Sequence, residues 1–433
     1  MASSDRRVLR RLAALPAVAC LVLAGASCSA DTAAPAPGIT SAPCPQSPHT
    51  DRGCLYLGVL SDLEGGPFTA LGVSMNEGQR AFWDEVNKAG GIGGYDIDLA
   101  TYTRNTAYDP RTHRTAYQEI SPHVLALAMS FGTAQTLAML NDMDADDMVA
   151  TAATQWSGWG FRSADRNLVL SGGYSYCVEA INALDWFTQD HYHPQRIAVV
   201  GYRGTFGEDF AAGAMRWAVA NEAAIADTIE TGPNNEVGNQ DSTVAQVLAA
   251  QPDLVTLATG PAETAEIVGK LVKSGYTGRF LGSLITWNPA LLKSPAAPAL
   301  TALYNFTSPI DSWDGNSIGA QRARRALGHE PNNLGYNLGW AISYPMRALL
   351  TKAAATGELT RTGLRRTMEN LLPDSEGIAP VQRIGASAPD PSIDWSVVYT
   401  PDEQAPVGAR VVRSTYRGPT LGKTTLSEPC KPI

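Results

Sequence analysis

Histidine and clusters of basic residues are scarce in this chain of 433 residues. It holds six histidines, and none has the spacing to other ligand types that a metal site needs, so the sequence predicts no metal site. Acidic residues outnumber basic ones, 42 against 33, for a formal net charge of −9. No basic cluster follows the first 27 residues, which argues against nucleic acid or an anionic membrane surface as a partner.

Catalytic signatures are also lacking. The glycine run GGIGG at 90–94 follows a helix-like segment and precedes a strand-like one, the reverse of the order in a dinucleotide-binding motif. No pattern pairs a nucleophile with a general base, and none gathers metal ligands. We therefore expect neither enzyme activity nor a cofactor.

The first 27 residues predict an export signal. Basic residues in DRRVLRR (5–11) precede an uncharged stretch from Leu12 to Ser27. That stretch is shorter than the roughly 20 apolar residues of a membrane-spanning helix and is typical of a signal peptide. Its end, LAGASC at 23–28, resembles the lipobox of bacterial lipoproteins, which implies lipidation of Cys28. Plain secretion with cleavage near Ala30 is the alternative, and Sec and twin-arginine export both stay open.

Residues 28–53 predict a flexible tether, because they are rich in Pro, Ala, Ser and Thr and show no apolar period. Four cysteines follow Cys28, and in an exported protein they predict up to two disulfides. Their connectivity stays open, and a free thiol is the alternative for Cys177. The four are Cys44, Cys54, Cys177 and Cys430.

The stretch FWDEVNKAGGIGGYDIDLATY (82–102) predicts the end of a helix, a glycine turn and a strand. Apolar residues upstream recur at spacings of three and four, as on one face of a helix, and 95–102 alternates like a strand. Another strand-like run lies at 54–63. Together these segments predict a βαβ unit.

Strand-like and helix-like segments alternate along the following chain, which predicts an α/β fold with parallel sheets. Strands are expected at 124–130, 148–154, 167–173, 196–202, 253–259, 279–284 and 395–400. Helices are expected at 134–143, 177–190, 207–223, 243–250, 261–274 and 335–356.

Four segments, in order, resemble type I periplasmic binding proteins of the branched-chain amino-acid ABC transporter group. The first runs from Cys54 and carries Gly66-Pro67, Gly72, Asn87, Gly90-Gly91-Ile92 and Gly94. The others are YDPRTHRTAYQEI (108–120), RIAVVGYRGTFGEDFAAGAM (196–215) and LVTLATGPAETAEIVGKLVKSGYTGRFLGS (254–283).

This resemblance implies two Rossmann-like lobes with parallel central sheets, joined by three crossovers, with the ligand in the cleft between them. Lobe 1 would comprise 54–172 and 302–376, and lobe 2 would comprise 173–301 and 377–425. Residues 426–433 would form a C-terminal tail.

The resemblance also implies where a ligand carboxylate is held. Thr133 matches the family's carboxylate-binding serine position, and Ala152 to Thr154 match a loop that offers a backbone carbonyl and a threonine hydroxyl. The alternatives are structural: Thr133 could cap its helix, and the loop around Thr154 could be a strand-end turn.

Glu263 lies where branched-chain amino-acid binders carry the acid that pairs with the ligand ammonium. The alternative is a first-turn glutamate favoured by the helix dipole. Phe206 matches the family's Tyr-Gly tyrosine and Trp156 follows the threonine loop, so either could wall the pocket or be a core aromatic.

We therefore expect a monomeric, extracytoplasmic substrate-binding component of an ABC import system, lipid-anchored to the outer face of a bacterial cell membrane. It would bind an amino acid or a related carboxylate and deliver it to a permease and its ATPase. Two alternatives stay open. One is a sensor of the same fold acting on a signalling partner, and the other is a binder of an amide or organic acid.

Overall fold

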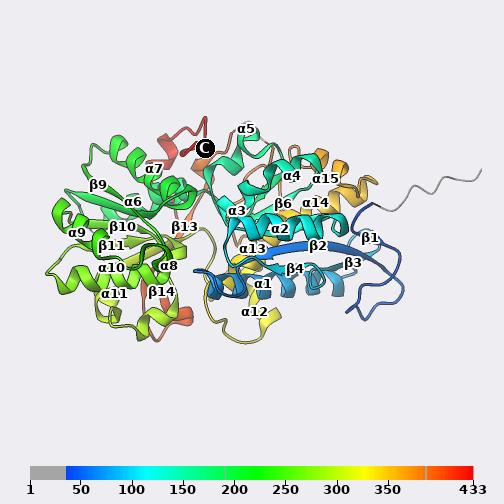
Figure 1. The fold of residues 1–433 in the computed structure, drawn as a ribbon, viewed down its shortest axis with the longest axis horizontal. Helices are drawn as coiled ribbons and strands as arrows, with labels where there is room; N and C mark the ends of the chain where they lie inside the picture. The colour runs from blue at the N-terminus through cyan, green and yellow to red at the C-terminus, as the bar shows by residue number, and fades with distance from the viewer. Residues whose placement is uncertain (1–35, 191, 386–387, 433) are drawn as a thin grey trace, which may run out of the picture. The chain divides into compact units, whose positions relative to one another are not determined.

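The computed structural model describes residues 36–190, 192–385 and 388–432 (Figure 1). The predicted signal peptide and Cys28 lie outside the described residues. Within these ranges the chain forms two seven-stranded sheets. None of the helices in the described part of the chain has both the length and the apolar character needed to cross a membrane.

The first sheet has the strand order β1-β2-β5-β6-β7, and β3 and β4 also pair with β2. All its pairings are parallel except that of β1 with β2. The strands are β1 (Ile39–Thr40), β2 (Gly53–Ser61), β3 (Tyr95–Asp98), β4 (Thr103–Asn105), β5 (Ala126–Phe131), β6 (Ala150–Ala153) and β7 (Val169–Ser171).

The second sheet has the order β14-β13-β12-β11-β10-β8-β9. Its first five strands along the chain are parallel, and the last two add antiparallel at one edge. The strands are β8 (Ile197–Tyr202), β9 (Ile225–Thr231), β10 (Leu254–Ala258), β11 (Arg279–Gly282), β12 (Tyr304–Ser308), β13 (Ser396–Pro401) and β14 (Ala409–Tyr416).

Helices cover both faces of the sheets, and in Figure 1 α2 and α4 lie on one side of β2 and α1 on the other. Every residue of β5 and β6 is buried, as expected of strands covered on both faces. The helices are α1 (Thr69–Lys88), α2 (Pro110–Ile120), α3 (Thr133–Ala138), α4 (Leu140–Ala145), α5 (Arg162–Asp165), α6 (Tyr176–Asp190), α7 (Thr205–Ala220), α8 (Asn234–Val237), α9 (Asp241–Ala250), α10 (Pro261–Lys273), α11 (Ala297–Leu303), α12 (Ile318–Leu327), α13 (Gly335–Ala341), α14 (Ser343–Ala355) and α15 (Arg361–Thr367).

The glycine turn after α1 locks the helix to β3. Gly91 has a φ of +68°, and a Cβ there would lie 2.1 Å from the carbonyl oxygen of Tyr95. Only glycine fits such a position. Asn87, in the last turn of the helix, accepts a hydrogen bond of 2.8 Å from the N–H of Ile97 and donates one of 2.9 Å to its carbonyl. The predicted βαβ unit is confirmed.

The chain crosses between the two sheets three times. It leaves the first sheet after β7 and enters the second at β8, leaves the second after β12, and returns to it at β13. Between β12 and β13, helices α12 to α14 pack against α1 and the first sheet. Lobe 1 is therefore the first sheet with α1–α5 and α12–α15, and lobe 2 is the second sheet with α6–α11. This arrangement confirms the predicted fold class.

Two predicted boundaries differ from the structure. The second part of lobe 1 was predicted to begin at residue 302. The segment that follows contains β12, which pairs with β11 in the sheet of lobe 2, so the crossover follows Ser308. The predicted tether also ends earlier, because the segment from Ala36 onward is attached to lobe 1. It adds β1 to the first sheet, and a disulfide joins Cys44 to Cys54.

A buried carboxylate completes this attachment. Asp96 accepts a hydrogen bond of 2.9 Å from Arg52 and lies 2.8 Å from Nδ1 of His49. Burial acts to raise the pKa of Asp96, but hydrogen bonds from Ser47, His49 and Arg52 outweigh it and lower the pKa. Composition does not reveal this segment, because a disulfide and a charge hold it rather than apolar burial.

Several predicted elements are divided. The strand expected at 95–102 ends at Asp98 as β3, and β4 begins beyond it at Thr103. The helix at 134–143 is α3 and α4, and the helix at 335–356 is interrupted at Ile342. Strands β9 and β14 were not predicted. Both lie at sheet edges and keep most residues exposed or half-buried, so neither carries a continuous apolar run.

Candidate functional site

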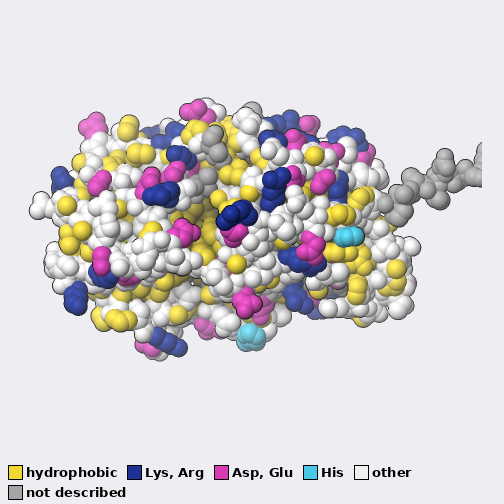
Figure 2. All heavy atoms as spheres, in the orientation of Figure 1, with side chains coloured by type: hydrophobic (Ala, Val, Ile, Leu, Met, Phe, Trp, Pro, Cys, Tyr) yellow, Lys and Arg dark blue, Asp and Glu magenta, His cyan; other side chains and the backbone are white. Residues whose placement is uncertain are grey.

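The carboxyl ends of the parallel strands of both lobes point to the same region. Ligands of open α/β sheets bind at such ends. The segment after β6 comes from lobe 1, and the segments after β8, β10 and β11 come from lobe 2. Figure 2 shows hydrophobic side chains gathered near the middle of the face, where the lobes meet.

Three hydroxyl groups form a chain at this place. Thr133 begins α3 and is 2% exposed, and its hydroxyl bonds to that of Thr154, just after β6. The Thr154 hydroxyl also lies 3.3 Å from that of Tyr176. Gly132, with a φ of +104°, precedes the helix, and Thr133 makes no capping bond there. The hydroxyl of Thr133 thus bonds to Thr154 on the cleft side and does not cap α3.

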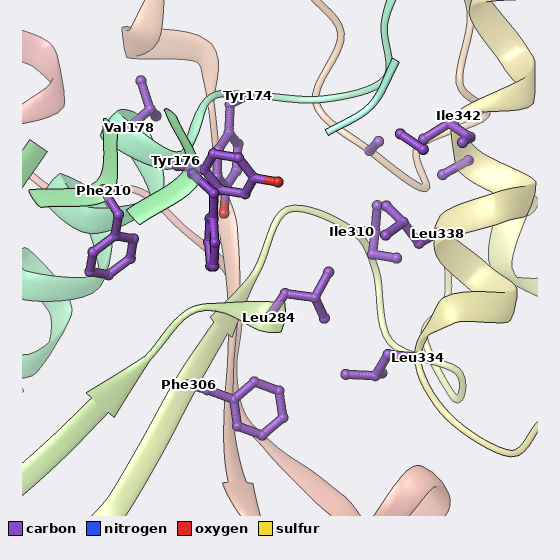
Figure 3. Packing of buried hydrophobic residues seen from close by; sticks show 14 of the residues in the cluster. Tyr174, Tyr176, Val178, Phe210, Leu284, Phe306, Ile310, Leu334, Leu338 and Ile342 are labelled. Carbon is purple, nitrogen blue, oxygen red and sulfur yellow. The ribbon is translucent and has the colours of Figure 1, made fainter. Parts of the chain in front are cut away.

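A small apolar pocket adjoins the hydroxyl chain, and we call it the cleft pocket. In Figure 3, Leu338 and Ile342 project from the α13 side toward Leu284 and Tyr176 of lobe 2. The empty space within it, open solvent at its mouth included, is about 360 Å³, and its described lining residues include no Lys, Arg or His. The lining residues are Leu71, Met75, Phe131, Ala153, Thr154, Gln155, Tyr176, Glu179, Ser283, Leu284, Ile285, Leu338 and Ile342.

Glu179 is the carboxyl group of the cleft pocket, and the sequence analysis did not find it. It is 1% exposed and accepts hydrogen bonds of 2.8 Å from the Ser283 hydroxyl and 3.0 Å from the Leu284 N–H. A third, of 3.2 Å, comes from the Thr307 hydroxyl. Burial raises its pKa to about 7, although these bonds oppose the rise. A charged residue in the apolar run YCVEAINAL (176–184) was the available signal.

Glu263, the predicted ammonium partner, lies behind an aromatic wall instead of in the cleft pocket. It is 4% exposed, and its carboxylate accepts 2.6 Å and 2.8 Å hydrogen bonds from the Tyr202 hydroxyl and the Asn234 N–H. Burial, and then the charge of Glu263, raise the pKa of Tyr202. At Gly260 a Cβ would lie 2.5 Å from the Tyr202 oxygen, so glycine permits this close approach.

The aromatic wall joins both lobes. Phe206, predicted to wall the pocket, has its ring centre 4.8 Å from that of Tyr176 and 6.3 Å from that of Tyr202. Tyr202 in turn lies 6.1 Å from Phe68, which precedes α1 in lobe 1. Phe206 therefore belongs to the cleft, next to the hydroxyl chain.

Ala152 and Trp156 lie elsewhere. Ala152 is inside β6, paired with Ser130 on one side and Ser171 on the other, and its side chain packs in the core on the far face. The indole Nε1 of Trp156 donates a 2.9 Å hydrogen bond to the carbonyl of Lys431 in the C-terminal segment. Neither residue lines the cleft pocket.

The C-terminal segment is part of the fold between the lobes (Figure 1). A disulfide joins Cys430 to Cys177 at the start of α6, and the N–H of Cys430 donates 2.8 Å to the hydroxyl of Ser157. Asp209 is fully buried beside them and accepts 3.1 Å hydrogen bonds from the N–H groups of Ser157 and Cys177. The predicted tail thus ties a lobe 1 loop to lobe 2.

Signs of catalysis are weak. In the described ranges, no group of three or more His, Cys, Asp or Glu residues is arranged to hold a metal ion. Gly315-Asn316-Ser317-Ile318-Gly319 has the Gly-x-Ser-x-Gly spacing of hydrolase nucleophiles. Ser317, however, follows a loop and caps α12 by accepting from the N–H of Ala320 at 3.1 Å, so it lacks the strand-to-helix turn of that motif.

Known proteins share this fold. The model of a family described as "Periplasmic binding protein" matches residues 55–393. A fatty acid ABC transporter substrate-binding protein from Thermomonospora curvata is similar with a TM-score of 0.79 and 22% identity, covering 91% of this chain and 97% of that one. A comparison with curated protein sequences gave no match.

Two further solved structures share the fold. A branched-chain amino acid ABC transporter protein from Thermus thermophilus, with bound valine, has a TM-score of 0.69 and 14% identity, covering 86% of this chain and 98% of that one. An R. palustris solute-binding protein in complex with benzoate has a TM-score of 0.66 and 15% identity, covering 84% and 97%.

Proposed function

The chain belongs to the periplasmic binding protein family, and from this membership we propose that it is the substrate-binding component of an ABC import system. Members of the family bind solutes and are not enzymes, which confirms the prediction of a non-catalytic binding protein. We further propose that its ligand is a small carboxylic acid with an apolar body, held in the cleft pocket.

The observation that carries this proposal is the hydroxyl chain beside an apolar pocket. Thr154 and Tyr176 line the cleft pocket, and Thr133 bonds to Thr154 beside it. Each hydroxyl can donate to a carboxylate, and hydrogen bonds to a charged group are worth about 1.5–3 kcal/mol. Leu71, Met75 and Leu338 offer apolar surface for the remainder of the ligand. Pockets of this kind, mostly apolar with a few convergent polar groups, are typical of small-molecule sites.

The position of Glu263 favours an unaminated acid over an amino acid. Its carboxylate is already bonded to Tyr202 and Asn234, and it does not line the cleft pocket. Glu179 does line the pocket, but three hydrogen bonds from protein groups already reach its carboxyl. Among the described lining residues, a ligand ammonium therefore meets only the Glu179 carboxyl, which three neutral donors already satisfy in part. Fatty acid and benzoate, named for two of the similar structures, are both carboxylates with apolar bodies.

The proposal includes the predicted location. The protein would act outside the cytoplasm, anchored through a lipid on Cys28, and deliver its ligand as a monomer to a permease with its ATPase. Two disulfides, Cys44–Cys54 and Cys177–Cys430, support an oxidising compartment.

A thermal-shift panel on residues 29–433 tests the ligand class. The panel pairs benzoate with benzamide, hexanoate with hexanamide, and leucine with its α-keto acid. A ligand at about 1,000 times its Kd adds about 4 kcal/mol, a shift of several degrees. We expect the acids to raise the melting temperature and their amides to leave it unchanged. A shift with leucine but not with its keto acid would establish an amino-acid site instead, and no shift with any acid would overturn the proposal.

A further inference from the structure

A second cavity lies away from the cleft pocket and shares no lining residue with it. The empty space within it, open solvent at its mouth included, is about 740 Å³. Gly173 to Ser175 of the first crossover form one wall, and the segment from Gln382 to Gly385, with Asp394, belongs to the third crossover and forms another. We call it the crossover cavity.

Two indoles form an aromatic wall of the crossover cavity. Trp156 and Trp159 pack edge to face with ring centres 4.9 Å apart, and both line the cavity. Trp159 is 4% exposed, and within the described residues its Nε1–H has no hydrogen-bond acceptor. A buried N–H without an acceptor is destabilising, so an acceptor brought by a ligand would be stabilising.

Two buried carboxyl groups line the same cavity. Asp394 is 2% exposed and accepts a 2.9 Å hydrogen bond from Gln382 on Oδ1. Asp165 is 5% exposed and accepts a 2.8 Å bond from the N–H of Asn167. Burial raises the pKa of Asp394 to about 8 and that of Asp165 to about 7.

Nearby arginines offset the two carboxyls only in part. Arg162 lines the cavity and its charge acts to lower the pKa of Asp165, but its guanidinium also pairs with Glu369 at 2.6 Å. Arg383, also in the lining, points one nitrogen to the carbonyl of Asn370 at 3.4 Å. The remaining charges that act on Asp394 are Asp390 and Arg417, which oppose each other.

We propose that the crossover cavity is a second binding site, for a small organic cation that also carries a hydrogen-bond acceptor. The cation offsets the desolvated carboxyls Asp165 and Asp394, whose ionisation the nearby arginines favour only in part. The indole rings of Trp156 and Trp159 add a cation–π attraction. The acceptor satisfies Nε1 of Trp159. This site is independent of the cleft ligand and of the proposed function.

Choline is the probe, because it combines a quaternary ammonium with a hydroxyl, and 3,3-dimethyl-1-butanol is its uncharged isostere. Calorimetric titration of residues 29–433 should show choline binding with a Kd of about 1 mM or tighter, and the isostere at least about tenfold more weakly. Equal affinity for the two would overturn the cation assignment. Absence of choline binding would overturn the site.

Variants locate the binding. Asp394→Asn and Trp159→Phe should each weaken choline binding at least about fivefold. Asp402→Asn is the matched control, because Asp402 pairs with Arg410 on the lobe 2 surface, and it should leave choline affinity unchanged. Thr154→Val, in the cleft, should also leave it unchanged, and a loss there would place choline in the cleft and overturn the proposal. A cooperative melting transition establishes that each variant is folded.

Proton release gives an independent readout. A bound cation favours the ionised form of both carboxyls, so choline binding at pH 7 should release protons and give a heat that depends on the buffer's ionisation enthalpy. Asp394→Asn should reduce this release. A choline heat that is the same in all buffers would contradict the role of the carboxyls.

Discussion

The hydroxyl of Tyr202 donates a 2.6 Å hydrogen bond to the carboxylate of Glu263, and the tyrosine ring stands within the aromatic wall of the cleft. The carboxylate that the family pattern assigns to a ligand ammonium is therefore a support for that wall. Asn234, whose N–H donates to the other carboxylate oxygen at 2.8 Å, holds it in place.

Glu263→Gln should barely change the affinity for an unaminated acid, by less than about threefold, because the side chain does not contact the ligand. The amide can still accept from Asn234, but Tyr202 loses a charged acceptor, so the free energy of unfolding should fall by about 1 kcal/mol. Urea denaturation and calorimetric titration measure the two effects. A tenfold loss of ligand affinity would instead place Glu263 in contact with the ligand.

Thr133→Val and Thr154→Val should each weaken binding of the acid by about tenfold, because valine keeps the shape and removes the donor. The double variant should lose less than the product of the two, since the two hydroxyls bond to each other. Thr136→Val is the matched control on the same helix. Its hydroxyl bonds to the Gly132 carbonyl at 2.8 Å and to Ser130, so it should lose stability but keep affinity. Equal effects of all three would contradict the site.

The sequence predicted the parallel strands well because both faces of those strands are buried. Continuous apolar runs such as 124–130 and 253–259 have no other common cause in an α/β chain. Strands β9 and β14 lie at sheet edges, where half-exposed residues leave no such run. The composition of 36–52 did not predict that this segment is attached to lobe 1. The Cys44–Cys54 disulfide and hydrogen bonds to Asp96 hold it there, and neither leaves a run of apolar residues in the sequence.

The candidate site was predicted in part, for a reason of side-chain direction. Thr133, Thr154 and Phe206 come together in the structure, whereas Ala152 points to the far face of β6 and its neighbour Ala153 lines the pocket. Alternate residues of a strand face opposite sides. The expectation for Ala152 to Thr154 concerned a backbone carbonyl and the Thr154 hydroxyl, so the direction of the Ala152 side chain leaves it a prediction. Trp156 is held away by Lys431, a contact across 275 residues that no local pattern indicates.

Removal of the Cys177–Cys430 disulfide should destabilise the protein more than removal of Cys44–Cys54. The two links span 253 and 10 residues, and the chain-entropy model gives a loss of about 5 kcal/mol for the longer loop and about 3 kcal/mol for the shorter. Double alanine variants of each pair, compared by urea denaturation, measure the difference. An equal or smaller loss for Cys177–Cys430 would show that the hydrogen bonds to Trp156 and Ser157, rather than the disulfide, hold the C-terminal segment.

The free energy of unfolding should depend on pH through Glu179. Its pKa of about 7 in the folded protein exceeds its ordinary value of 4.5, so the folded state binds the proton more tightly than the unfolded state. The stabilisation is therefore complete below pH 4.5 and is lost as the pH rises through 7, at 1.36 kcal/mol per unit, or about 3 kcal/mol in all.

Glu179→Gln should remove this part of the decline. The amide can accept from Leu284 and Thr307 and donate to the Ser283 hydroxyl, so the hydrogen bonds persist while the titration disappears. Urea denaturation between pH 5 and 8 should show a shallower fall in the variant than in the wild type. In the variant the free energy of unfolding should still fall with rising pH, because burial also raises the pKa values of Asp165, Asp209 and Asp394. Glu119→Gln, on the surface, is the control and should parallel the wild type. If Glu179→Gln also parallels it, Glu179 ionises as readily in the folded protein as in the unfolded chain, and the carboxylate is then available to a ligand ammonium after all.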